Sequence, residues 1–96
     1  MLLCIDVGNT QTIVGLFDDA ELADHWRIST VHERTHDELA LMIHQFLGFH
    51  GFDIEERVSG VAISSGVPVV TAALRHMTRR YFGFEALVLE LSLIHI

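Results

Sequence analysis

This chain of 96 residues has only one cysteine and one proline. A lone cysteine, Cys4, cannot form an intrachain disulfide, which favours a reducing compartment. Its place inside an apolar run indicates a small buried side chain rather than a reactive thiol. The apolar runs are too short to span a bilayer, and the first residues lack the pattern of a secretion signal. We therefore expect one cytoplasmic globular domain.

Lysine is missing altogether, and the six basic residues face thirteen acidic ones, for a net charge of −7. This balance argues against nucleic acid as a partner, because such binding needs clustered positive charge. The nearest basic cluster is Arg75, Arg79 and Arg80 with His76, whose spacing fits the solvated outer face of a helix. An acidic protein can still bind a nucleotide when turn amides and a metal meet the phosphates.

The first ten residues, MLLCIDVGNT, join an apolar run to one carboxylate and a polar turn. The run predicts a strand buried on both faces. Asp6 at its end is costly to desolvate, so we expect it to have a cation or hydrogen-bond donors as partner. Gly8-Asn9 is typical of a two-residue hairpin turn, with the Thr10 hydroxyl beside it. The turn is either an ordinary polar hairpin or a phosphate site in which Asp6 holds a metal and the amides from Asn9 through Thr12 meet phosphate oxygens.

Hydrophobic periodicity predicts an α/β domain with the element order β-β-β-α-β-α-β, a mixed sheet with helices packed against it. After the first strand, we expect strands at 12–17, 22–29, 57–65 and 86–89, with a turn at 18–20. This order, with an acid ending the first strand, matches the ribonuclease H-like half-domain of the acetate and sugar kinase, Hsp70 and actin superfamily.

Each predicted helix has a start signal and an apolar stripe. Thr35 and Glu38 form a capping box, and Pro68 suits the first turn of the second helix. The stripes are Leu39, Met42, Ile43, Phe46 and Leu47 in the first helix, and Val70, Leu74, Met77 and Tyr81 in the second, which ends at Gly83.

Residues 32–36 spell H-E-x-x-H, the zinc protease signature, in which both histidines share one helix face. The capping box starts the helix at Thr35, so His32 precedes it and the two imidazoles need not share a face. We therefore do not expect zinc hydrolysis. The chain also lacks the G-x-x-x-x-G-K-[ST] pattern of a P-loop.

Four motifs in order resemble those of the type III pantothenate kinases. They are Asp6-Val7-Gly8-Asn9-Thr10 with Gly15, Trp26-Arg27-Ile28-Ser29-Thr30, Arg34-Thr35 with Asp37-Glu38, and Ile63-Ser64-Ser65-Gly66-Val67-Pro68. The resemblance implies transfer of phosphate from ATP to pantothenate, giving 4′-phosphopantothenate in the first step of coenzyme A synthesis. It also implies a cytoplasmic homodimer that needs Mg2+ with ATP and a monovalent cation, K+ or NH4+. Carried over by motif, the ATP phosphate-binding residues would be Asp6, Val7, Gly8, Asn9, Thr10, Gln11, Thr12 and Ile13, with Asp6 acting through the metal.

The resemblance places the rest of the catalytic apparatus beyond residue 96. In the family, a Gly-Ala-Asp-Arg segment with the catalytic acid, a second Asp-x-Gly-Thr phosphate loop, the monovalent-cation ligand and a second half-domain all follow the fifth strand. Phosphoryl transfer needs both positioning and charge stabilisation at the transferred group. We therefore expect the 96-residue chain to hold no catalytic residue and to be inactive alone.

Residues 91–96, LSLIHI, do not resemble the family and match the in-frame translation of a sequencing-library adapter. We expect a domain at 1–90 and a non-native tail at 91–96, the alternative being a natural hydrophobic C-terminus. Two alternatives to a kinase remain open. The chain is a nonenzymatic nucleotide-binding regulator or transcription-activator homologue of the same fold, or it is a nonfunctional fragment with aggregation-prone sheet edges.

Overall fold

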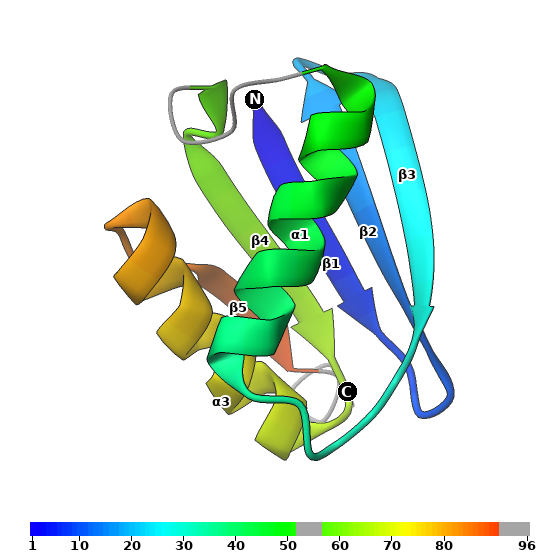
Figure 1. Ribbon diagram of the computed structural model, residues 1–96, viewed down its shortest axis with the longest axis vertical. Helices are drawn as coiled ribbons and strands as arrows, with labels where there is room; N and C mark the ends of the chain where they lie inside the picture. Colours follow the sequence, from blue (N-terminus) through cyan, green and yellow to red (C-terminus); the bar gives the residue numbers. More distant parts are fainter. Residues whose placement is uncertain (52–56, 91–96) are drawn as a thin grey trace.

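A computed structural model describes residues 1–51 and 57–90 and contains one mixed five-stranded sheet (Figure 1). In chain order the strands are β1 (Leu2–Val7), β2 (Gln11–Asp18), β3 (Glu21–Ser29), β4 (Gly60–Ser65) and β5 (Leu87–Glu90). Their order in the sheet is β3-β2-β1-β4-β5. The first three strands pair antiparallel, whereas β4 runs parallel to β1, and β5 runs parallel to β4. This is the arrangement of a ribonuclease H-like half-domain, so the predicted fold class is confirmed.

The helices α1 (His36–His50) and α3 (Pro68–Met77) cover the same face of the sheet (Figure 1). The predicted capping box is present at α1. The amide of Glu38 donates to Thr35 Oγ1 at 3.1 Å, and the Thr35 amide donates to Glu38 Oε1 at 3.2 Å. The helix ends at Gly51, whose φ of 84° is a left-handed conformation that glycine adopts without strain. Pro68 begins α3 as expected.

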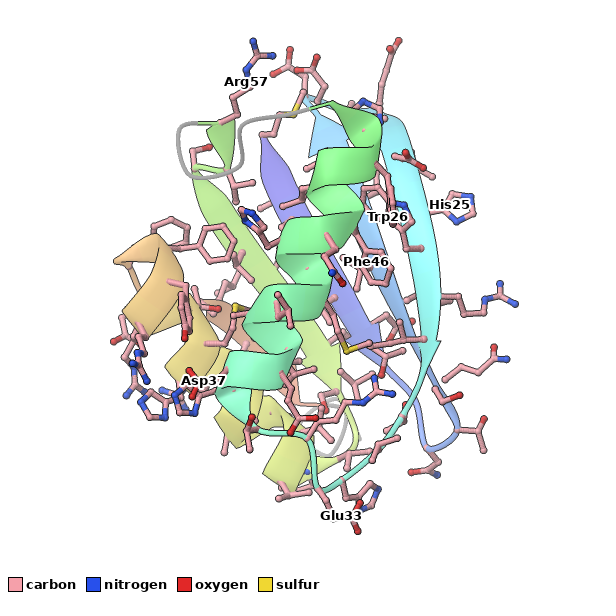
Figure 2. The ribbon with its side chains drawn as sticks, in the orientation of Figure 1. His25, Trp26, Glu33, Asp37, Phe46 and Arg57 are labelled. Atoms are coloured by element: carbon pink, nitrogen blue, oxygen red, sulfur yellow. The ribbon has the colours of Figure 1, made fainter. Side chains whose placement is uncertain are left out.

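The core lies between the helices and one face of the sheet. Leu3, Ile5 and Val7 of β1 point into it, and β2 and β4 contribute residues of matching register. The α1 stripe is confirmed, with Leu39, Ile43 and Leu47 buried and Met42 and Phe46 half-buried. Trp26 of β3 stacks on Phe46 with ring centroids 5.4 Å apart, whereas His25 points away from the helices (Figure 2).

The prediction that β1 is buried on both faces is wrong. Leu2 is 40% exposed, Cys4 is half-buried and Asp6 is exposed, because in the part of the chain that the structure describes the helices cover the opposite face. We call the side of the sheet that carries Leu2, Cys4 and Asp6 the open face. The half-buried Cys4 keeps a thiol whose pKa is raised by burial, which agrees with its expected low reactivity.

The four strands after the first differ from the predicted ranges at one end or both, most of all the fourth. The fourth strand begins at Gly60 rather than Arg57, because Gly60 pairs with Leu2, the first residue of β1, and the residues from Arg57 to Ser59 lie beyond the start of that strand. The fifth strand is Leu87–Glu90, one residue later than expected. The turn at Asp18–Ala20 is confirmed, with Asp19 at a φ of 53°.

A π-helical turn follows α3 and corrects the predicted stripe. The segment η1 (Thr78–Phe82) ends at Gly83, whose amide donates to the Thr78 carbonyl. A π turn holds an extra residue, so the buried position after Met77 moves on from Tyr81. Phe82 packs against the core instead, and Tyr81 is exposed.

Adjacent leucines of β1 give a matched test of one-sided burial. Leu3 is 0% exposed in the core, whereas Leu2 lies on the open face. We expect Leu3→Ala to lower the free energy of unfolding by about 2–5 kcal/mol, since it leaves a cavity among close-packed side chains. Leu2→Ala should cost roughly half of that or less. Urea denaturation of both variants checks this, and equal losses would contradict burial of one face.

Candidate functional site

The candidate site lies where the carboxyl ends of β1 and β4 meet. Because these two central strands are parallel, both ends reach the same edge of the sheet, and α1 and α3 also begin there (Figure 1). In open α/β sheets, ligands bind outside the carboxyl ends of the strands. The predicted phosphate-binding residues follow β1 at this edge, so the fold places them where a ligand site is expected.

The loop from β1 to β2 is one residue longer than the turn that its sequence suggests. Three residues, Gly8, Asn9 and Thr10, join the strands, and the Gly8 amide donates to the Gln11 carbonyl at 2.9 Å. The predicted two-residue Gly-Asn turn is wrong, because neither residue has the positive φ that such turns require. A Cβ at Gly8 would lie 3.1 Å from the Gln11 carbonyl oxygen. A side chain there would make the Gln11 carbonyl shift by a few tenths of an ångström, so glycine favours the close approach of the two chain segments.

The tip of this loop offers unused donors. The amides of Asn9 and Thr10 form no hydrogen bond in the part of the chain that the structure describes, and both residues are exposed. Successive free amides in a turn make a site that attracts anions. Gln11 is also exposed, Ile13 is half-buried, and Val7 and Thr12 are buried. Val7 and Thr12 could therefore meet a ligand through backbone atoms alone.

Asp6 lies on the open face, exposed to solvent. Its neighbours across the sheet are Ile13 of β2 and Ser64 of β4. Within residues 1–51 and 57–90 its carboxylate makes no hydrogen bond or ion pair. The premise that Asp6 is desolvated is wrong, because its side chain is exposed to water, and a cation as its partner stays a prediction. The carboxylate is instead available to an incoming cation.

Thr30 also belongs to this site, in a role that was not predicted from the sequence. Its side chain and amide both bond to the loop of Gly8–Thr10, because β3 ends beside the start of β2. The register of Gln11 with Ser29 places it there. A signal existed, since two antiparallel strands joined by the short turn at 18–20 bring residue 30 back to residue 10.

The segment after β4 is structural. The Ser65 hydroxyl is buried and bonds to the backbone of Val67 as both donor and acceptor, at 3.2 Å and 3.0 Å. This local bonding fixes the turn that leads into α3.

The H-E-x-x-H histidines do not share a helix. His32 and Glu33 lie in the turn before α1, and His36 is the first residue of the helix. His36 instead stacks on His76 of α3, with ring centroids 3.8 Å apart. No group of three or more potential metal ligands occurs among the described residues.

The basic cluster is exposed, as expected, but it also joins two elements. Arg80 donates to Asp37 of α1 at 3.2 Å, and the Tyr81 hydroxyl donates to the same carboxylate oxygen. The Tyr81 bond holds the pKa of Asp37 below its ordinary value of 3.8, and the carboxylate raises the pKa of Tyr81 above 10.0. This contact, labelled at Asp37 in Figure 2, fastens the start of α1 to η1.

Comparison with known proteins decides the family. A family model described as type III pantothenate kinase matches residues 2–95. The chain belongs to the type III pantothenate kinase family. The type III pantothenate kinase of Streptomyces griseus is 50% identical over 86 residues, covering 86% of this chain and 32% of that protein. The type III pantothenate kinase of an Anaeromyxobacter species is 44% identical over 87 residues, covering 91% of this chain and 34% of that protein.

This member of the type III pantothenate kinase family spans about a third of the length of the curated relatives it matches. Among solved structures, the Ppx/GppA family member of Aquifex aeolicus has a TM-score of 0.48 and 11% identity, over 94% of this chain and 35% of that one. The strand order described above, rather than this likeness, assigns the fold. Neither α1 nor α3, the helices of the described ranges, has the length and apolar character to cross a bilayer.

The contact between Asp37 and Tyr81 predicts two changes with pH. A lowered pKa at Asp37 adds stability above pH 3.8 that is lost as the pH falls through the lowered value. A raised pKa at Tyr81 adds stability below pH 10.0 that is lost as the pH rises through the raised value. Tyr81 is the sole tyrosine, so ultraviolet absorbance reports it alone among tyrosines. We expect a titration midpoint above 10.0 that falls toward 10.0 in Asp37→Ala.

Glu85→Ala is the matched control for this titration, because Glu85 pairs with Arg79 of the same η1 segment. We expect it to leave the Tyr81 midpoint in place. A midpoint that is the same in Asp37→Ala as in the unchanged chain would show that the carboxylate does not govern Tyr81.

Proposed function

We propose that this chain supplies the first phosphate-binding half of an ATP-dependent pantothenate kinase. One observation carries the proposal. Among the described residues, the exposed carboxylate of Asp6 has no protein partner, and it precedes the unbonded amides of Asn9 and Thr10 at the carboxyl end of a central strand. Membership of the type III pantothenate kinase family supports the substrates, ATP and pantothenate.

The chemistry of Asp6 fits a divalent cation. Mg2+ prefers oxygen ligands, keeps several waters, and is held in nucleotide sites by one or two carboxylates together with substrate phosphates. An exposed carboxylate at the strand end meets that need without a change in the fold. When bound with ATP, Mg2+ neutralises charge on the phosphate oxygens.

The loop of Gly8–Thr10 has a separate task. The amides of Asn9 and Thr10 donate to phosphate oxygens, so they bind the nucleotide without a basic side chain. This explains how a chain with a net charge of −7 binds an anion. Gly8 keeps the loop tight, since a side chain there would press on the Gln11 carbonyl. Val7, Gln11, Thr12 and Ile13 complete the proposed contact segment around Asp6 and the loop.

The remaining features of the proposed enzyme follow from the family resemblance. They are a catalytic acid and second phosphate loop beyond residue 96, a requirement for K+ or NH4+, a homodimer, and action in the cytoplasm. One phosphate loop without the second loop and the catalytic acid does not position the phosphoryl group for transfer. We therefore propose that the chain of 96 residues binds Mg-ATP weakly and transfers no phosphate.

Binding of Mg-ATP to the chain tests the proposal. We expect resonances of the Gly8–Thr10 loop to shift in an NMR titration, and the affinity to fall at least about tenfold in Asp6→Asn, which loses about 1.4 kcal/mol or more of binding free energy. Asp18→Asn is the control, since Asp18 ends β2 at the opposite edge of the sheet. Equal affinity in Asp6→Asn and the unchanged chain would remove Asp6 from the metal role.

A further inference from the structure

Thr30 follows β3 directly and forms three hydrogen bonds to the segment that begins β2. Its hydroxyl donates to the Gly8 carbonyl at 2.8 Å, and its amide donates to the Thr10 carbonyl at 2.9 Å. A third bond, also 2.8 Å, joins the Thr30 and Thr12 hydroxyls. One residue therefore bonds to Gly8, Thr10 and Thr12, which span the whole loop.

The direction of these bonds follows from counting protons. The Thr30 hydroxyl has one proton, which goes to the Gly8 carbonyl. In the bond between the hydroxyls, Thr12 must then be the donor and Thr30 the acceptor. Thr12 is 3% exposed, so its hydroxyl would lack a partner if Thr30 did not accept from it. The Thr12 hydroxyl therefore donates to the Thr30 hydroxyl, which in turn donates to the Gly8 carbonyl.

This chain of bonds fixes the direction of an amide that faces solvent. A trans peptide unit is planar, with its C=O and its N–H on opposite sides, and none of the described peptide bonds is cis. The Gly8 carbonyl and the Asn9 amide belong to one such unit. Because Thr30 holds the Gly8 carbonyl, the Asn9 amide must point the opposite way, toward the unbonded side of the loop.

We propose that Thr30 is a positioning residue, which holds the Gly8–Asn9 peptide unit so that the Asn9 amide is aimed at a phosphate oxygen before the nucleotide arrives. The inference rests on the proposed function for its ligand, a nucleotide phosphate. Donors that are fixed in advance cost little ordering entropy on binding. Thr30 acts through the loop and does not itself touch the ligand.

Three variants test this role in the 96-residue chain. Thr30→Val keeps the branched shape and the amide but removes the hydroxyl, and Thr30→Ser restores the hydroxyl. Thr78→Val is the matched control, because the buried Thr78 hydroxyl donates to the Leu74 carbonyl of α3, away from the loop. Two quantities are measured by NMR: the backbone order parameter of the Asn9 amide without ligand, and the dissociation constant for Mg-ATP.

We expect Thr30→Val to lower the Asn9 order parameter from the rigid range, about 0.85, to below about 0.6. We also expect it to raise the dissociation constant for Mg-ATP about tenfold, because the net contribution of one hydrogen bond is about equal to a tenfold change in affinity. Thr30→Ser should restore both quantities, and Thr78→Val should change neither. An unchanged order parameter, or unchanged affinity, in Thr30→Val overturns the inference.

The order parameter separates this inference from the proposed function. If the unchanged chain does not respond to Mg-ATP, the proposed function fails, and positioning is still decided by whether Thr30→Val loosens Asn9 and Thr30→Ser restores it. If Thr30→Val does not fold, Thr30→Ala takes its place. That variant also removes the hydroxyl that donates to the Gly8 carbonyl, so loosened Asn9 supports the inference and unchanged Asn9 overturns it.

Discussion

The alternation of side chains along β1 is the constraint on which the rest of the structure depends. This strand lies at the centre of the sheet, antiparallel to β2 and parallel to β4. Its register sends Leu3, Ile5 and Val7 into the core and leaves Asp6 on the open face. A slip of one residue would exchange the two sets, burying a carboxylate and exposing the core side chains. The packing that stabilises the domain thus also delivers Asp6 to solvent at the edge where the loop begins.

The same strand explains why the site lies at one edge. Parallel pairing with β4 brings the ends of both central strands together, and the helices that follow the sheet strands begin at that edge (Figure 1). The adjoining β2 and β3 add Thr30, whose bonds close the loop from its far side. The strands β1, β2 and β3 therefore together fix the conformation of the Gly8–Thr10 loop.

Local signals made much of this fold predictable. The capping box at Thr35, Pro68 at the start of α3 and the period of the α1 stripe each depend on residues within one or two turns. Features that depend on distant partners were missed. The open face depends on which side the helices cover, and the start of β4 depends on where β1 begins. The exposure of Tyr81 depends on a π-helical turn that no short sequence motif predicts.

The residues of the candidate site were chosen from a sequence motif, and their role in binding phosphate stays a prediction, whereas the geometry of the loop could not be predicted. The motif at Asp6 through Thr10 indicated a phosphate loop, but not that Gly8 and Asn9 lack positive φ or that Thr30 bonds to both sides of the loop. The register between β2 and β3 determines those bonds, and a motif read along one strand does not contain it.

The most direct test joins residues 1–90 to the downstream two-thirds of the Streptomyces griseus relative, and measures phosphate transfer from Mg-ATP to pantothenate. We predict turnover by the joined protein and none by the 96-residue chain, because the joined protein has both phosphate loops and the 96-residue chain has only the first. A joined protein that melts cooperatively yet shows no turnover would contradict the claim that this chain supplies the first half of the kinase site.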